Sequence, residues 1–250
     1  MENKRNYIIG IAGCKNSGKD TVADMINYIF HVGITKANYS DYLTTKNKIQ
    51  NKLHERTIHF ADNLKKCISI LYNIDINTLN NRKYKDELYY CINTNKFINE
   101  ENIGGKYTKI DIDDLKYETL REILEFNDRN NLISIIKIRT LLQYFGTDLC
   151  RNNLSNNIWI KSTISNAVYI AETKKVCIIP DVRFENEANA IKNNTMSLYG
   201  RVIKINRNVE QQTHDSENID FKCDYIIDNN GTLMQLFYKV LNIIVKLLNK

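Results

Sequence analysis

The chain has 250 residues, of which 43% are hydrophobic and 26% are charged, and its formal net charge is +6. This length suits one α/β domain, alone or with an insertion, and the apolar fraction is enough for a sizeable core. No apolar run is long enough to span a bilayer and no N-terminal stretch resembles a signal peptide, so we expect a cytoplasmic protein with no membrane partner.

The cysteines and the net charge narrow the kinds of site and ligand that we expect for this protein. The six cysteines are scattered with no C-x-x-C pair, which argues against a zinc site and against a disulfide framework. The positive charge suits an anionic ligand. No dense run of Lys and Arg with interleaved aromatic residues is present, so we expect no nucleic-acid partner.

The first predicted elements flank a loop that contains two glycines. Residues 7–12 form a short apolar, β-branched run that is typical of a buried strand. Residues 22–30 carry apolar side chains at helical spacing. Between them, residues 13–21 read Gly-Cys-Lys-Asn-Ser-Gly-Lys-Asp-Thr. A strand, a glycine loop and a helix in this order are the context in which a phosphate-loop pattern is credible.

The loop has the chemistry to bind a nucleotide phosphate. Gly13 and Gly18 allow consecutive N–H groups to converge on an anion, and the dipole of the following helix favours negative charge at the same place. Lys19 adds a positive charge that can reach the β- and γ-phosphates. The alternative is a glycine-rich turn that binds nothing. It would not explain why Lys19, the preceding strand and the following helix occur together. We therefore expect ATP to contact Gly13, Lys15, Asn16, Ser17, Gly18, Lys19, Asp20 and Thr21.

The residue after the loop lysine bears on the metal. A Ser or Thr usually stands there and ligates Mg²⁺ with its hydroxyl. Here Asp20 takes that place and Thr21 follows. The pattern leaves open whether Asp20, Thr21 or both hold Mg²⁺.

A second strand and helix are predicted next. Residues 56–61 read as a short strand, and a helix start capped by Asp62 or Asn63 follows. Lys65 lies early in that helix, where it is either a second phosphate contact for the substrate or a solvated helix lysine. The pattern favours neither reading.

Residues 80–131 have looser periodicity and read as an insertion within a single domain of residues 1–250. Residues 93–108, with two adjacent glycines, suit a hairpin or a mobile loop, and residues 113–126 show helical spacing. We expect this segment to be a lid or a substrate-binding subdomain.

Residues 138–151 form a second dense patch. Its leucines and a phenylalanine can share one helical face, which displaces Arg139, Gln143 and Arg151 from that face. Two arginines that flank a glutamine could clamp a phosphate and read a base edge, or they could be solvated. Gly146 lowers the helix propensity, so we expect a break or a close approach there.

A central strand is predicted after a helix over residues 157–169. It covers residues 175–184, with Asp181 at its tip and Arg183 just beyond. A carboxylate at the carboxyl end of a buried strand is what a Walker B element supplies, and open α/β sheets bind ligands at that edge. Asp181 could thus serve the metal and Arg183 the phosphates. The two could instead pair with each other, or Arg183 could pair with Glu187 on the next helix.

The remaining elements complete an alternating α/β pattern. A helix opens at residue 185, strands cover residues 201–205 and 223–227, and an amphipathic helix covers residues 233–248. Arg207 follows a strand end, where it could stack on adenine or lie on the surface.

Taken in order, these segments resemble the deoxynucleoside monophosphate kinases of bacteriophages and large DNA viruses. The resemblance covers most of the chain but is weak across residues 80–131. The loop alone would be unspecific, because phosphomevalonate and dephospho-coenzyme A kinases share it. The segments that carry the resemblance are Gly13–Ala23, Phe60–Lys65, Arg139–Arg151 with Trp159, Asp181–Phe184 with Asn186–Ala188, and Asp224–Leu236.

The resemblance implies a three-layer P-loop kinase fold with a mostly parallel central sheet. It also implies ATP-dependent phosphorylation of deoxynucleoside 5′-monophosphates in the cytoplasm of a host cell. A homodimer is compatible with the sequence, and Asp20 after the loop lysine also occurs in this group. A related small-molecule kinase and a nucleotide-binding protein without turnover are the alternatives. The expected catalytic residues are Lys19, Arg139, Arg151, Asp181 and Arg183, and the expected substrate contacts are Lys65, Arg139, Gln143, Arg151 and Arg183.

Overall fold

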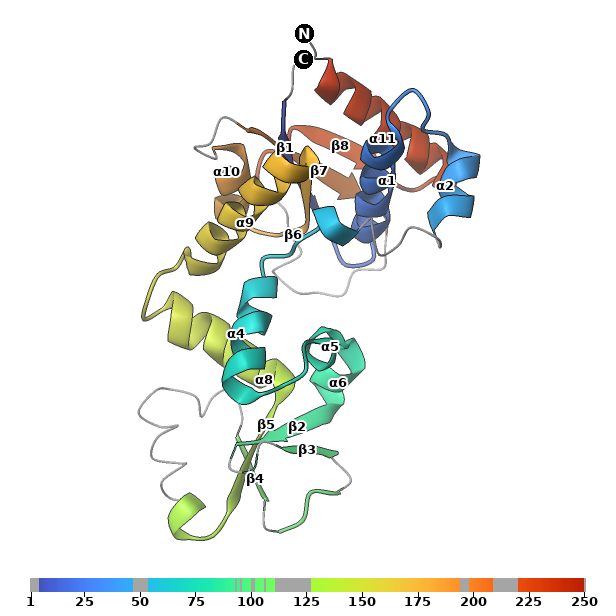
Figure 1. Ribbon diagram of the computed structural model, residues 1–250. Coiled ribbons are helices and arrows are strands. Elements are labelled where there is room, and N and C mark those ends of the chain that lie inside the picture. Colours follow the sequence, from blue (N-terminus) through green and yellow to red (C-terminus); the bar gives the residue numbers. More distant parts are fainter. Residues whose placement is uncertain are drawn as a thin grey trace. The chain divides into compact units, whose positions relative to one another are not determined.

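The computed structural model describes residues 5–46, 54–92, 94, 96–99, 102–105, 107–110, 127–193, 198–208 and 220–249. Its contacts divide the chain into two compact units. The first unit consists of Met1–Phe60 and Ile160–Lys250, and the second unit is Ala61–Trp159. Figure 1 labels the helices and strands of both units.

The first unit is built on a four-stranded parallel sheet in the order β6-β1-β7-β8. Because the strands run parallel, their carboxyl ends share one edge of the sheet. The register places Ala12 opposite Val182 and Gly13 opposite Ile205 at that edge. The strands are β1 (Tyr7–Gly13), β6 (Val176–Val182), β7 (Tyr199–Asn206) and β8 (Tyr225–Asp228).

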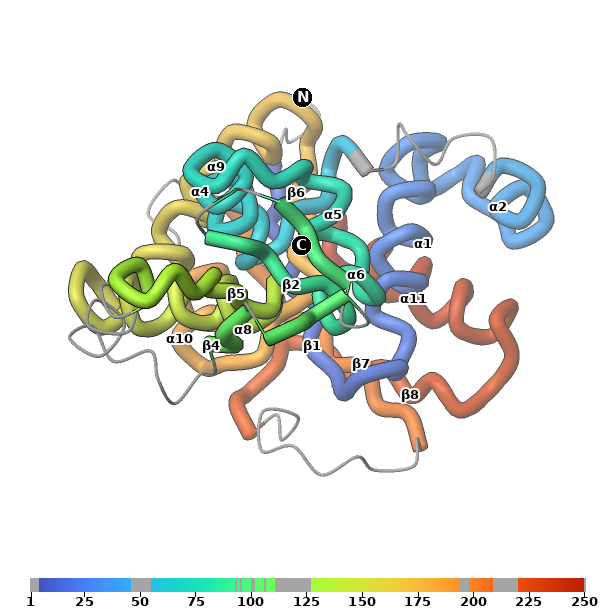
Figure 2. The backbone as a smooth tube through the Cα atoms, turned by 90° about the horizontal axis from the view of Figure 1, so that it is seen from below, coloured from blue at the N-terminus to red at the C-terminus, as the bar shows by residue number. Residues whose placement is uncertain are grey.

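Helices cover both faces of this sheet. One core cluster joins β1 residues such as Ile9 and Ile11 to α1, α2 and α11, and the views of Figures 1 and 2 agree that α1 and α11 lie side by side. The other cluster joins Ile8 and Ala12 to α9 and α10. The helices are α1 (Lys19–Val32), α2 (Tyr39–Lys46), α9 (Ile158–Lys174), α10 (Glu185–Lys192) and α11 (Leu233–Leu248).

The period-two alternation of a strand explains these two clusters. Successive β1 side chains point to opposite faces, and both faces are apolar, so both can be buried under helices. The predicted three-layer α/β fold with a mostly parallel sheet is confirmed.

The predicted strand over residues 56–61 is wrong in extent. His54–Arg56 form a 3₁₀ turn, and only Thr57 bridges in parallel to Ile178 of β6. The Ile58 N–H donates to the Ile178 carbonyl at 3.0 Å, but the Phe60 N–H donates to the Asp181 carboxylate. A side chain thus takes over the pairing that a longer strand would have supplied.

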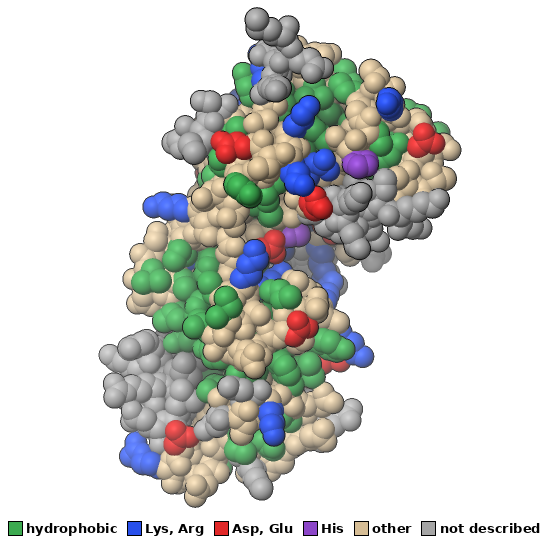
Figure 3. Space-filling view, in the orientation of Figure 1, with side chains coloured by type: hydrophobic (Ala, Val, Ile, Leu, Met, Phe, Trp, Pro, Cys, Tyr) green, Lys and Arg blue, Asp and Glu red, His purple; other side chains and the backbone are tan. Residues whose placement is uncertain are grey.

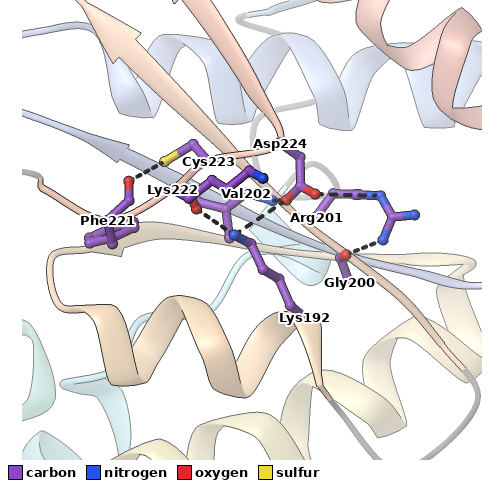
Figure 4. A network of polar contacts seen from close by, with 8 residues as sticks. All are labelled: Lys192, Gly200, Arg201, Val202, Phe221, Lys222, Cys223 and Asp224. Carbon is purple, nitrogen blue, oxygen red and sulfur yellow. Dashed lines mark hydrogen bonds and ion pairs between the residues drawn. The ribbon is translucent and has the colours of Figure 1, made fainter.

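Strand β8 begins two residues later than predicted because Asp224 makes a different contact with β7. The Asp224 carboxylate accepts a hydrogen bond from the Val202 N–H at 2.8 Å, and the Asp224 N–H donates to the Val202 carbonyl at 2.8 Å. Lys192 and Arg201 lie 3.9 Å from the same carboxylate (Figure 4). This network ties the chain before β8 to the amino-terminal half of β7 and to α10.

The second unit contains a mixed sheet in the order β3-β2-β5-β4. Strand β2 pairs antiparallel with β3 and β5, and β4 pairs parallel with β5. The strands are β2 (Leu88–Cys91), β3 (Lys96–Asn99), β4 (Tyr107–Ile110) and β5 (Ile133–Lys137). The helices are α4 (Asp62–Tyr72), α5 (Ile76–Asn80), α6 (Arg82–Glu87), α8 (Ile138–Gln143) and the π-helical η4 (Tyr144–Arg151).

The patch at residues 138–151 is not one uniform helix. It changes to π-helical geometry at Tyr144, and Gly146 lies in the π-helical part. A Cβ on Gly146 would lie 2.8 Å from Leu64 Cδ2, and the Gly146 carbonyl accepts a hydrogen bond from Trp159 Nε1 at 2.9 Å. The close approach predicted at Gly146 is confirmed.

The looser segment, residues 80–131, falls within the second unit. The described residues of 93–108 do not form a hairpin by themselves, because β3 pairs antiparallel with β2, which precedes this range, and β4 pairs parallel with β5. The helical spacing at residues 113–126 lies outside the described residues. That the segment acts as a lid stays a prediction.

Surface charge is distributed over the visible face of the molecule. The described lysines and arginines lie singly or in small groups on the face that Figure 3 shows, with hydrophobic side chains between them. Within the described ranges, no helix combines the length and the apolar character needed to cross a membrane.

Candidate active site

The side chain of Lys19 folds onto the backbone of the loop between β1 and α1. Lys19 Nζ donates to the carbonyl oxygens of Gly13 and Cys14, at 2.7 Å each. The Ser17 N–H donates to the Cys14 carbonyl at 3.2 Å and closes a tight turn. The ammonium group therefore lies at the loop, beside the amino terminus of α1.

Two glycines are required for this backbone. Gly18 has φ +100°, in the left-handed region that favours glycine. At Gly13 the reason is space, because a Cβ would lie 2.5 Å from Ser17 Oγ and 2.8 Å from the Ile205 carbonyl oxygen. Asn16, with φ 64°, also adopts a left-handed conformation, which asparagine tolerates better than most residues.

The interior of the loop contains a buried hydroxyl. Ser17 is 1% exposed, and its Oγ has no hydrogen-bond partner within the described part of the chain. A buried polar atom without a partner costs free energy. A ligand or a water that reached it would recover that cost.

Asp181 lies at the same edge of the sheet as the loop. It is the penultimate residue of β6, and its neighbour Val182 is opposite Ala12 at the end of β1. The carboxylate accepts from the Phe60 N–H at 3.1 Å and 3.3 Å to its two oxygens. The structure therefore brings Asp181 to the sheet edge from which the loop begins.

The donor atoms at this edge suit Mg²⁺. Asp20 is exposed and Thr21 is half-buried in the first turn of α1, and with Asp181 they offer only hard oxygen donors. Mg²⁺ takes one or two carboxylates together with substrate phosphates and waters. Within the described ranges no group of three or more His, Cys, Asp or Glu could hold a metal ion.

Arg183 is exposed and follows β6 directly. The contact to Glu187 runs from the Arg183 backbone N–H, at 2.8 Å, and the Phe184 N–H donates to the same oxygen at 3.2 Å. Glu187 is 3% exposed, so a buried carboxylate stabilises the turn between β6 and α10. The sequence pattern had suggested only a pairing of Glu187 with the arginine side chain.

Arg207 is brought to the rim of the loop. It follows β7, is exposed, and its Nη1 lies 3.5 Å from the Asn16 carbonyl oxygen as a long hydrogen bond. Its stacking on adenine stays a prediction. Lys15 lies in the same loop and is exposed.

The other predicted substrate contacts belong to the second unit. Lys65 Nζ donates to Asn80 Oδ1 at 2.9 Å and lies 3.8 Å from Asp62 Oδ1. Gln143 is exposed on α8, and Arg151 is half-buried at the end of η4. Arg139 and Gln143 are four residues apart on α8, so they share one face of that helix.

Arg139 has a partner that the sequence did not reveal. Its Nε donates to Asp86 Oδ1 of α6, and this hydrogen bond holds the pKa of Asp86 below its ordinary value of 3.8 and raises that of Arg139. Partial burial, Lys65 and Arg139 lower the pKa of Lys85. Lys65 of α4, Lys85 of α6 and Arg139 of α8 therefore form a basic cluster. In the sequence, the charges of α6 resemble an ordinary solvated helix face.

Comparison with known proteins identifies the relatives of this chain. A family model described as "Deoxynucleotide monophosphate kinase" matches residues 7–240. The deoxynucleotide monophosphate kinase of Escherichia phage RB69 is 28% identical over 249 residues, which covers 93% of this chain and 97% of the phage protein. That of Enterobacteria phage T4 is 23% identical over 257 residues, covering 94% and 97%. The deoxynucleoside-5′-monophosphate kinase of Escherichia phage T5 is 24% identical over 198 residues, covering 75% and 72%.

Proposed function

Since the chain belongs to the deoxynucleotide monophosphate kinase family, we propose that it transfers the γ-phosphoryl group of ATP to the phosphate of a deoxynucleoside 5′-monophosphate. The products are ADP and a deoxynucleoside diphosphate. Family membership makes the chain a phosphotransferase. The donor, the metal and the role of each residue are parts of the proposal.

One observation carries the assignment of the donor site, namely the position of Lys19. Its ammonium group lies 2.7 Å from two loop carbonyl oxygens, beside the first turn of a 14-residue helix. An anion bound there gains from the dipole of α1 and from the first N–H groups of the helix, which have no partner within a helix. Lys19 would exchange the carbonyl oxygens for oxygens of the β- and γ-phosphates.

Asp20, Thr21 and Asp181 would hold Mg²⁺ at the carboxyl edge of the sheet, with Asp181 acting through water. When bound, the ion supplies positive charge that offsets the charge of the donor phosphates. Arg207 at the loop rim would stack on the adenine of the donor, because a guanidinium plane packs well on an aromatic face.

The acceptor phosphate needs cations of its own. Arg139, Arg151 and Arg183 would bind it or neutralise the transferring group, and Lys65 would add a further contact. The hydrogen bond to Asp86 engages Arg139 at Nε, and the two terminal nitrogens carry four more N–H donors that suit a phosphate. Gln143 would hydrogen-bond the base.

The reaction requires no strong base, since an oxygen of the acceptor phosphate is already a competent nucleophile. Catalysis then rests on holding the donor and acceptor phosphates in line and on neutralising the charge that they share. These are tasks for the loop amides, Lys19 and the arginines.

A coupled assay of ADP formation tests the proposal. The purified protein is given ATP and Mg²⁺ with each of the four deoxynucleoside monophosphates, and in parallel with phosphomevalonate or dephospho-coenzyme A. We expect turnover with at least one deoxynucleotide and none with the other acceptors. Turnover only with phosphomevalonate or dephospho-coenzyme A would contradict the acceptor class. ATP binding without transfer to any acceptor would contradict catalysis.

A further inference from the structure

A residue near the carboxyl terminus reaches into the phosphate loop. Asn229 directly follows β8 and is 8% exposed. Its Nδ2 donates to the Ser17 carbonyl oxygen at 2.7 Å, across 212 positions of sequence, and its backbone N–H donates to the Asn206 carbonyl at 2.7 Å. Both ends of Asn229 are therefore fixed, one to β7 and the other to the loop.

We propose that Asn229 is a positioning residue that orients the Ser17–Gly18 peptide for binding the phosphates of the donor nucleotide. The proposal rests on the proposed function, because it assigns a role within the same donor site. It adds a residue that neither the loop motif nor the strand-end carboxylate predicts.

The geometry of the peptide bond carries the argument. The peptide bonds of the described residues are not cis, and in a planar trans peptide the carbonyl and the N–H point in opposite directions. Asn229 holds the Ser17 carbonyl, so the Gly18 N–H of the same peptide is directed away from Asn229. Gly18 directly precedes α1, where N–H groups without helical partners can bind an anion.

Gly18 and Asn229 also fit one another sterically. A Cβ on Gly18 would lie 2.5 Å from Asn229 Nδ2, so the amide occupies the space that any other side chain would fill. With φ +100° and no Cβ, Gly18 lets the Asn229 amide reach the carbonyl oxygen of Ser17 without a clash. The glycine of the loop is thus required by its long-range partner as well as by its own backbone angles.

Asn230 offers a matched comparison. It follows Asn229 directly, but its Oδ1 accepts from the Asn208 N–H at 2.8 Å and its Nδ2 donates to Asp228 Oδ1 at 3.0 Å. These contacts stabilise the turn after β8 and do not involve the loop. A substitution at Asn230 therefore tests the effect of an added charge and of a weakened turn, while the hydrogen bond to the Ser17 carbonyl is kept.

The experiment compares Asn229→Ala, Asn229→Asp and Asn230→Asp with the wild type. The dissociation constant of ATP is measured by calorimetry, the KM of the deoxynucleotide by the coupled assay, and the Tm without ligand by calorimetry. Asn229→Ala removes the donor, and Asn229→Asp places an acceptor against the Ser17 carbonyl. We expect the ATP affinity to fall about tenfold in the first and further in the second, while the KM of the deoxynucleotide stays within about twofold.

The control separates this role from a structural one. Asn230→Asp adds the same charge one residue away and should leave the ATP affinity within about twofold of the wild type. If Asn229→Asp fails to fold, Asn229→Ala decides. Two results would overturn this proposal: an unchanged ATP affinity in Asn229→Ala, or a loss of both ATP and deoxynucleotide affinity in that variant. In either case a wild type that still transfers phosphate would leave the proposed function standing. A wild-type protein that binds no ATP would overturn the proposed function as well.

Discussion

At the scale of single residues, Lys19 is expected to matter far more for turnover than for stability. Its ammonium group donates to two carbonyl oxygens of the loop backbone. Lys19→Ala removes a charge that acts directly on the transferring group, so kcat/KM should fall by about 10³ or more. The Tm should change by less than about 4 °C, which calorimetry can check.

Lys36 provides the control for that change, since it is an exposed lysine of the same unit outside the loop. Lys36→Ala should leave both kcat/KM and Tm near the wild-type values. A folded Lys19→Ala protein with near-normal turnover would refute the assignment of the phosphate loop.

Arg183 can be tested against its neighbour Glu187. Since Glu187 holds the Arg183 backbone N–H, Arg183→Ala keeps that hydrogen bond and should preserve the Tm. If the guanidinium neutralises charge in the transition state, kcat should fall strongly in Arg183→Ala and also in Arg183→Lys, because an ammonium lacks the planar fork. Glu187→Ala should instead lower the Tm, because two backbone N–H groups lose their acceptor. Full kcat in folded Arg183→Ala would exclude a catalytic role for Arg183.

The ion pair of Asp86 and Arg139 predicts a small dependence of stability on pH. The pKa of Asp86 is lower in the folded chain than its ordinary value of 3.8, so the pair stabilises the fold above that pH. The contribution is lost as the pH falls through the folded pKa and the carboxylate is protonated. Both side chains are about half exposed, so Asp86→Asn should cost less than about 1 kcal/mol at pH 7. Urea unfolding of both proteins from pH 7 to pH 2 should show the difference vanish; a difference that grows in acid would contradict the pairing.

At the scale of elements, Gly200 fixes how α10 packs against β7. A Cβ there would lie 1.8 Å from the Ile191 carbonyl oxygen, which is backbone and cannot move aside alone. Gly200→Ala should therefore cost about 3 kcal/mol or more, as overpacking of a core does at its upper end. Chemical denaturation measures this cost. Gly104→Ala, where no atom lies within 4 Å of the added Cβ, should change stability by less than about 0.5 kcal/mol. Equal effects of the two changes would refute this packing.

The elements predicted best from sequence were those whose pattern is local. The final helix was predicted with its observed bounds, Leu233–Leu248, because its apolar stripe is strong. In the structure a capping box of Thr232 and Gln235 stabilises its start. The strands β1 and β6 were found because both of their faces are largely apolar, and β7 was found from its short run with Val202, Ile203 and Ile205. A strand over residues 56–61 was expected, but its short extent could not be predicted, since the Phe60 N–H pairs with the Asp181 carboxylate in place of a strand backbone.

The same distinction holds for the candidate site. The loop and its glycines follow from a contiguous motif, and the structure gives a physical reason for each glycine. The partners Asn229 and Asp86 escaped prediction because each acts through a contact that depends on the folded chain, as the 212-residue separation between Ser17 and Asn229 illustrates. Glu187 was expected as a partner of Arg183, but its contact with the backbone N–H groups was not. An Asn in a chain rich in Asn carries no signal until its contact is known.

At the scale of the whole molecule, residues 80–131 are predicted to close over the acceptor. A saturating ATP analogue together with a deoxynucleoside monophosphate should slow hydrogen exchange in the described parts of this segment, such as β2 and β3. The ATP analogue alone should slow exchange mainly in the phosphate loop. Exchange in residues 80–131 that is unchanged by both ligands together would count against closure.

Trp159 has a consequence for spectroscopy. It is the only tryptophan of the chain, it is 6% exposed, and its indole N–H is held by the Gly146 carbonyl in the core of the second unit. Fluorescence excited selectively at the indole therefore has a single emitter, and this emitter is buried. The red shift of that emission in denaturant follows the loss of the core cluster of the second unit, in which the Trp159 side chain is buried. Circular dichroism follows both units, so a gap between the two curves would reveal that they melt separately.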